Sequence, residues 1–112
     1  MPYDEDLVNR LRAELADHFD ALTEKRMFGG LAFLLHGHLC VAASHSGGLL
    51  ARVDPDASAS LLDPPRVERM VMNGREMNGW LRVAPEAFGT DAQLAAWVKR
   101  CVAFVQTLPP KR

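Results

Sequence analysis

An apolar stripe near the C-terminus is the feature that most restricts the fold of this chain. Its members recur at spacings of three, one, three, three, one and three, namely Leu94, Trp97, Val98, Cys101, Phe104, Val105 and Leu108. This period places them on one face of an α-helix. Thr90 and Gln93 fit a capping box at the start of the helix, and Pro109-Pro110 ends it. A long helix with one apolar face must pack on another layer, so the rest of the chain has to supply that layer.

A second helix is predicted at the N-terminus. Its apolar residues follow one another at spacings of four, four, four and three, namely Leu7, Leu11, Leu15, Phe19 and Leu22. Asp4 can cap the first turn by accepting hydrogen bonds from its amides, and the acidic residues around it suit the positive end of the helix dipole. We therefore expect a helix from about Asp4 to Leu22.

The stretch between these helices has the composition of strands and turns, because glycine, asparagine and proline separate its apolar segments. It predicts five strands, at Met27 to Leu35, Leu39 to Ala43, Leu49 to Val53, Arg69 to Met72 and Gly79 to Val83. Asp54-Pro55 begins a short helix, and Asp63-Pro64-Pro65 ends it. The expected order is α-βββ-α-ββ-α in a single domain over residues 1–112. This is an α+β fold in which two long helices and one short helix pack with a five-stranded, mainly antiparallel sheet.

Composition and charge exclude several classes of protein. A chain of 112 residues that is 48% hydrophobic and 24% charged is an ordinary globular domain rather than a disordered or fibrous one. Its formal net charge of −1 argues against a general polyanion binder. The longest apolar run, Leu31 to Leu35, is too short to span a membrane, and the chain begins without a signal-peptide pattern. We therefore expect a cytoplasmic protein in which Cys40 and Cys101 are buried free thiols.

The segment from His36 to Cys40 is a candidate metal site. His36, His38 and Cys40 would share one side of an extended strand, and imidazole with thiolate suits zinc or copper. Gly37 between the histidines also fits a hairpin turn, in which they need not share a face, and we favour that interpretation. Cys40 with His38 is the nearest approach to a nucleophile and its base, but no motif supplies an oxyanion hole. We therefore expect no enzymatic activity, no metal and no cofactor.

The segment Phe28-Gly29-Gly30 behind Lys25 and Arg26 is a candidate anion site. Glycine amides beside a cation can cradle a phosphate. These glycines precede a predicted strand rather than open a helix, and neither the dinucleotide-binding nor the P-loop pattern is present. We favour glycines that let a strand bend or lie against a helix.

One face of the predicted sheet lacks a cover. Apolar residues occupy both alternations of Leu31 to Leu35, and Met70 and Met72 are candidates for the exposed face. Large exposed apolar patches usually mark an interface. The sequence therefore predicts a homodimer.

Four segments together resemble the TfoX/Sxy N-terminal domain family over about residues 5–111. They are "KRMFGGLAFLLHGHLC", "GLLARVDP", "MNGREMNGWLRVAPEAF" and "LAAWVKRCVAFVQTLPPK". The residues that carry most of the likeness, called the signature below, are Arg26, Met27, Phe28, Gly29, Gly30, Arg52, Val53, Gly79 and Trp80.

This resemblance implies an α+β fold similar to the secretion-chaperone-like architecture, often dimeric. It also implies regulation of competence genes together with the cyclic-AMP receptor protein at promoters. No enzymatic activity or catalytic residue is implied. The longer family members add a C-terminal helical domain, which the 112 residues of this chain do not contain.

Two functional hypotheses follow. The first is a regulatory or adaptor module that binds another protein, as yet unidentified, through the sheet face and a surface formed by Lys25, Arg26, Arg52, Arg66 and Arg69. The second is a domain that binds a small ligand or nucleic acid in a cleft beside Gly29-Gly30, with the nearby arginines.

Overall fold

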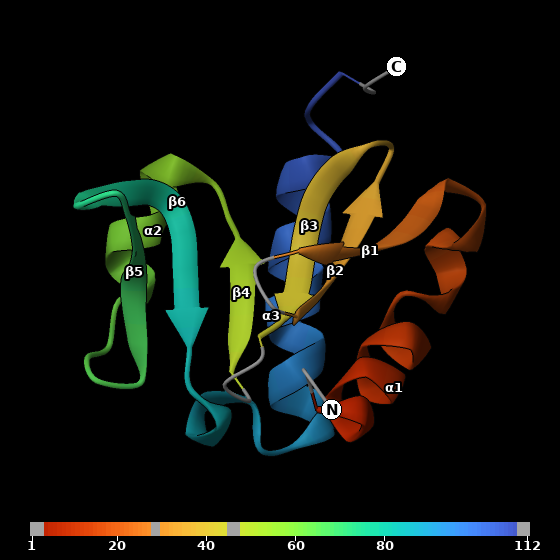
Figure 1. Cartoon of the computed structure of the whole chain (residues 1–112), viewed down its shortest axis with the longest axis horizontal. Coiled ribbons are helices and arrows are strands. Elements are labelled where there is room, and N and C mark those ends of the chain that lie inside the picture. The colour runs from red at the N-terminus through yellow and green to blue at the C-terminus, as the bar shows by residue number, and fades with distance from the viewer. Residues whose placement is uncertain (1–3, 28–29, 45–47, 110–112) are drawn as a thin grey trace.

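The computed structural model describes residues 4–27, 30–44 and 48–109. It confirms an α+β fold and has six strands in place of the predicted five. The elements in chain order are α1 (Glu5–Glu14), η1 (Ala16–Ala21), β1 (Leu22–Met27), β2 (Gly30–Leu35), β3 (His38–Ala43), β4 (Leu49–Arg52), α2 (Pro55–Leu61), β5 (Val67–Met72), β6 (Arg75–Val83), η2 (Pro85–Phe88) and α3 (Asp91–Val105). All the strand pairs are antiparallel, in the order β1-β2-β3-β4-β6-β5 (Figure 1).

The N-terminal helix is shorter than its stripe predicted. Asp4 caps α1 as expected, accepting from the amides of Asp6 and Leu7. The helix stops at Glu14, a 3₁₀ segment follows, and Leu22 already belongs to β1. Leu22 pairs with Leu35 of β2, so pairing with the sheet outweighs the local helical period at this point.

The additional strand, β1, begins the sheet. The sequence predicted one strand from Met27 to Leu35, whereas Met27 and Gly30 face each other at the end of a β1–β2 hairpin. Phe28 and Gly29 lie outside the described residues. The four residues from Thr23 to Arg26 are exposed, so β1 carries no apolar alternation that would have revealed it.

The caps agree with the sequence, whereas the last strand begins at Arg75 rather than at the predicted Gly79, because Asn73-Gly74 alone makes the turn. His36-Gly37 and Asn73-Gly74 form two-residue hairpin turns with positive φ at all four positions. Asp54 caps α2, which begins at Pro55. Thr90 and Gln93 form the predicted capping box of α3. This helix ends at Val105, before the Pro109-Pro110 stop signal.

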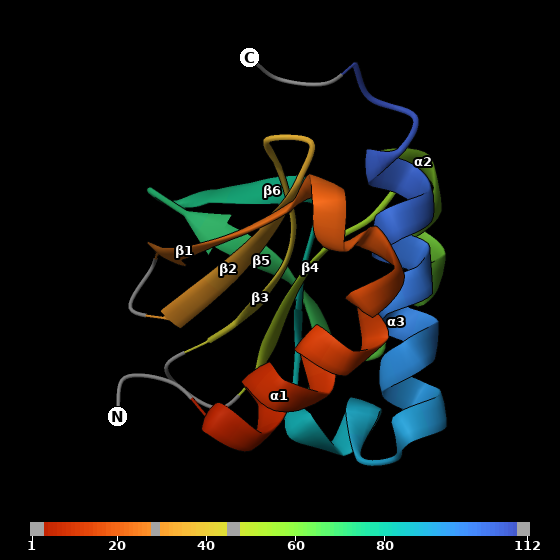
Figure 2. The same cartoon turned by 90° about the vertical axis from the view of Figure 1, so that its right-hand side faces the viewer.

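The helices lie on one side of the sheet only (Figure 2). The main core lies between these layers, and its central side chains include Leu11, Phe33, Leu81, Leu94 and Trp97. Cys40 and Cys101 are buried in it as free thiols, as predicted. Within the described ranges, no helix is long and apolar enough to cross a membrane.

Candidate functional site

The sheet face that no described helix covers carries a second apolar cluster. Ala32, Leu39, Ala42 and Leu50 are buried there, and Met27, Leu34, Met70 and Trp80 pack around them. Alternation along β2 explains it, because Leu31, Phe33 and Leu35 turn to the helices while Ala32 and Leu34 turn to the other side. The sequence prediction of apolar residues on both faces of this strand is confirmed.

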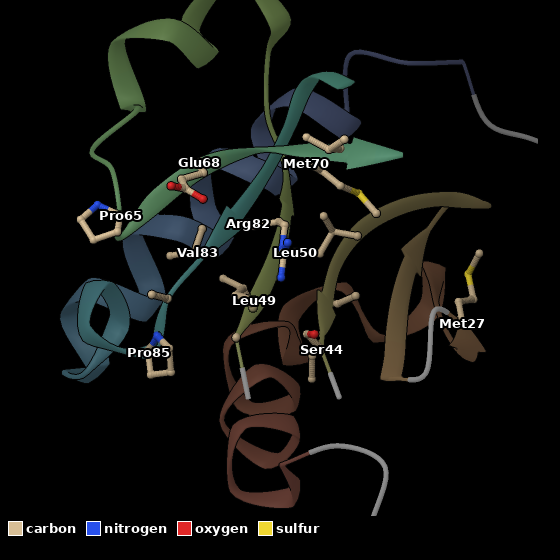
Figure 3. A pocket seen from close by; sticks show the side chains of 15 residues that line it. Met27, Ser44, Leu49, Leu50, Pro65, Glu68, Met70, Arg82, Val83 and Pro85 are labelled. Atoms are coloured by element: carbon tan, nitrogen blue, oxygen red, sulfur yellow. The ribbon is translucent and has the colours of Figure 1, made fainter. Parts of the chain in front are cut away.

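This face is hollowed into a groove of about 390 Å³ (Figure 3). Met27 of β1 and Met70 and Val71 of β5 line the same groove, although these strands are the two edges of the sheet. The sheet therefore curves around the groove. Val71 on its rim is 58% exposed, and the two methionines give the walls flexible, apolar side chains. The groove has a volume within the range of ligand-binding pockets.

The charged side chains in the groove are Arg82 and Glu68. They lie opposite each other in the β5–β6 register, yet no ion pair joins them among the described residues. In Figure 3 the guanidinium of Arg82 lies beside Leu50, its partner in the β4–β6 register, whereas the Glu68 side chain lies on the side of Pro65. The groove thus presents one central cation on an apolar floor.

The wall of the groove at Gly48 lies close to the backbone of β6. A Cβ on Gly48 would lie 2.9 Å from the carbonyl oxygen of Val83, which is shorter than any ordinary contact. The Ser44 amide donates to the Gly48 carbonyl at 2.8 Å and closes the segment between β3 and β4. A side chain at position 48 would therefore push this wall away from β6.

Two residues of the signature, Arg52 and Trp80, come together outside the groove. The guanidinium of Arg52 lies 4.9 Å from the centre of the Trp80 ring and 5.6 Å from that of Phe104. Trp80 belongs to the cluster on the uncovered face and Phe104 packs on the main core, so Arg52 links the two. Burial lowers the pKa of Arg52 from its ordinary value, while the Cys40 thiol acts in the opposite direction.

Gly79 joins the same region from β6 and contacts α2. Its φ is +87°, and an added Cβ would lie 3.0 Å from both the Val53 carbonyl oxygen and Pro55 Cγ. The Val53 amide donates to the Gly79 carbonyl at 2.8 Å. Beside it, the Ser58 hydroxyl is 2.9 Å from Asn78 Oδ1. These contacts fix β6 to the start of α2.

The candidate metal ligands are not gathered into a site. His36 is exposed in the hairpin turn with φ +52°, and Cys40 is fully buried. His38 Nε2 lies within hydrogen-bond distance of the Pro109 carbonyl oxygen and so connects the hairpin to the residues after α3. No group of three potential ligands occurs in residues 4–27, 30–44 and 48–109. Burial raises the pKa of Cys40 to about 12, so its thiolate is not available at neutral pH.

The five cations of the predicted binding surface are spread across the sheet from edge to edge, with Arg52 on the internal strand β4. Lys25 and Arg26 lie on β1, and Arg69 lies on β5. Arg66 is paired with Asp63, and Arg69 with Glu76 at 3.4 Å. Gly30 is buried at the start of β2 and does not line the groove. Met27, which pairs with Gly30, does line it, and Gly29 lies outside the described residues, so the cleft expected beside Gly29-Gly30 stays a prediction.

A smaller cavity of about 350 Å³ lies between α2 and the end of α3. Val53, Leu61 and Phe104 line it together with Asp54 and Arg100. Arg100 is stacked on Trp97 at 4.9 Å from the ring centre.

Sequence reasoning overlooked Arg82 and Glu68. Arg82 stands between apolar residues and Glu68 stands beside Arg69, and charges placed in this way are typical of any solvated strand face. The available signal was the alternation of β6, where Leu81 and Val83 are buried and Arg82 between them must turn the other way.

Comparison with protein families identifies one match. The model of the TfoX N-terminal domain matches residues 14–105. A search of curated proteins found no match, and neither did a search of solved structures.

Proposed function

Because the chain belongs to the TfoX N-terminal domain family, we propose that it is a non-catalytic regulatory module that acts by binding another protein. The family connects this role to transcriptional and competence regulation. The proposal places the module in the cytoplasm, where free thiols such as Cys40 and Cys101 persist.

The uncovered groove is the observation that carries this proposal. A sheet face that keeps its own buried apolar cluster, beside a rim residue that is 58% exposed, has the character of an interface. Cys40 has a raised pKa and His38 contacts the Pro109 carbonyl, so neither supports nucleophilic catalysis.

The shape of the groove favours a narrow segment of a partner protein. Both edge strands line it, so the face is concave. The same face of a second copy would be concave as well, and two concave faces do not fill each other. The homodimer expected from the sequence stays a prediction, and the experiment below also tests it.

Site-specific photocrosslinking tests the proposal. A photoreactive residue at Val71, on the rim, should capture one defined protein in cells of the source organism. The same residue at Ala96, exposed on α3, is the matched control. The captured protein, once purified, should bind the wild-type chain in calorimetry, fail to bind Val71→Asp and bind Ala96→Asp normally.

Four results would contradict the proposal. Capture of the same proteins from both positions would show that the groove has no selectivity. Equal binding by wild type and Val71→Asp would place the interface elsewhere. Crosslinking to a second copy alone would show that the groove serves the homodimer, and crosslinking to nucleic acid would favour the second hypothesis.

A further inference from the structure

We propose that Arg82 makes the groove selective for a carboxylate, so that the partner segment carries an acidic side chain among apolar ones. This inference rests on the proposed function, because it specifies the chemistry of the segment that the groove receives.

The register of the sheet fixes Arg82 on the floor of the groove. Arg82 lies directly opposite Leu50 of β4, and Leu50 belongs to the buried cluster of the uncovered face. Its neighbours Leu81 and Val83 turn into the main core. A shift of one residue would exchange these faces and bury the cation, so the placement of Arg82 is as strongly specified as the core itself.

Neighbouring carboxylates leave Arg82 without an anion. Glu76 is paired with Arg69, and Asp63 is paired with Arg66. Glu68 lies across from Arg82 in the register, but no ion pair between them occurs within the described residues. An arginine has five N–H donors and no acceptor, and no hydrogen bond or ion pair joins Arg82 to another of the described side chains, so a ligand that enters the groove can supply acceptors.

Covering the groove changes the energy of this cation. An apolar segment over Met27, Leu50 and Met70 would remove water from the guanidinium. Desolvating a charge without a partner is costly, whereas a bidentate carboxylate replaces the lost hydrogen bonds with charge-assisted ones. A segment that lacks the acid, or carries a base, is therefore rejected.

The surroundings of Arg82 favour a single carboxylate over a polyanion. Leu50 lies opposite Arg82 in the β4–β6 register, Met70 and Val71 line the same groove, and Glu68 adds a negative charge to it. A nucleic-acid backbone would place several phosphates near that glutamate and gain little from the methionine side chains. An acidic residue between apolar residues satisfies both features.

Three probes with the same eight-carbon tail test the carboxylate preference. Octanoate, octanol and octylammonium are titrated into the purified chain, and binding is followed by NMR shifts of the Leu50 and Val71 methyl groups. Octanoate should bind about tenfold more tightly than octanol, the effect of one hydrogen bond to a charged group. Arg82→Gln should lower the affinity for octanoate to that for octanol and leave the affinity for octanol unchanged. Arg82→Glu should make octylammonium the most tightly bound of the three probes. Arg75 is exposed and lies outside the groove, so Arg75→Gln should change neither the affinity for octanoate nor that for octanol.

The result that overturns the inference is equal binding of octanoate and octanol, or a preference that survives Arg82→Gln. The captured partner separates the two proposals. If it binds Arg82→Gln as well as wild type, the carboxylate inference fails and the proposed function stands. If octanoate is preferred but no partner is captured, the groove is a site for a free carboxylate and the partner segment is refuted.

Discussion

Gly79→Ala tests whether the β6–α2 contact requires glycine. Two separate effects act at this position. The backbone has φ +87°, where a side chain is strained, and a Cβ would lie 3.0 Å from the Val53 carbonyl oxygen and from Pro55 Cγ. Neither neighbour is the free end of a flexible side chain, so the backbone must move to admit a methyl group.

The cost follows from these two terms. The left-handed conformation costs a residue with a Cβ roughly 1 to 2 kcal/mol. Moving Val53 away from Gly79 weakens the hydrogen bond of 2.8 Å between the Val53 amide and the Gly79 carbonyl, worth about 1 kcal/mol, and disturbs the start of α2. We expect Gly79→Ala to lower the free energy of unfolding by about 2 to 4 kcal/mol, a large part of the stability of a small domain.

Two other glycines separate the terms. Gly74 has φ +78° with nothing within 4 Å of an added Cβ, so Gly74→Ala should show the conformational cost alone. Gly89 has φ −65° and ψ −30°, and the nearest atoms to an added Cβ are at 3.9 Å. Gly89→Ala should therefore be neutral or stabilise by up to about 1 kcal/mol. Urea unfolding followed by circular dichroism measures all three. If Gly79→Ala costs no more than Gly74→Ala, the contact with Val53 and Pro55 carries no energy and the reasoning is refuted.

Three further predictions concern the thiols, the cap of α3 and the arginine stack. Burial raises the pKa of Cys40 from 9.0 to about 12. Between these two pH values the folded state keeps the thiol proton, whereas the unfolded state releases it. The stability that the protonated thiol contributes is therefore complete below pH 9, and it falls by about 1.4 kcal/mol per pH unit between pH 9 and 12. Measured by urea unfolding from pH 8 to 11, the free energy of unfolding should fall less steeply with pH for Cys40→Ala than for the wild type. Parallel pH dependences of the two proteins would contradict the raised pKa of Cys40. Thr90→Ala removes the hydroxyl that accepts from the Gln93 amide and should cost about 1 kcal/mol of unfolding free energy, whereas an unchanged urea midpoint would show that the cap is dispensable. Arg52→Met should cost about 1 kcal/mol and alter Trp80 fluorescence in a Trp97→Phe background, and an unaltered spectrum would show that the stack is not formed in solution.

The elements with local signals were predictable from the sequence. The capping box at Thr90, the Asp54-Pro55 start of α2 and the Asn73-Gly74 turn all depend on residues within a few positions of one another. Strand β1 has no such signal, because its exposed residues from Thr23 to Arg26 form a strand only by pairing with β2. Long-range pairing is invisible to local periodicity, and this also explains why the first helix was predicted to reach Leu22.

The groove was harder to predict than the sheet. Its existence follows from curvature that brings β1 and β5 around one hollow, and curvature has no signature in the pattern of apolar residues. Met70 was recognised as a residue of the uncovered face, whereas Met72 has no described side chain. Arg82 became a candidate only when the register placed it opposite Leu50.

The residues that carry the family likeness and those that line the groove have little in common. Arg52, Gly79 and Trp80 join β4, β6, α2 and α3 by stacking and close backbone contact, and among the signature residues that the structure describes only Met27 lines the groove. The residues that carry the family likeness therefore account for the packing of the fold and not for the binding preference proposed for the groove. A substitution at Gly79 should reduce stability and binding together, whereas one at Arg82, which is exposed, should change binding alone. The partner that we propose has to be sought from the chemistry of the groove residues, among which Arg82 is the most specific.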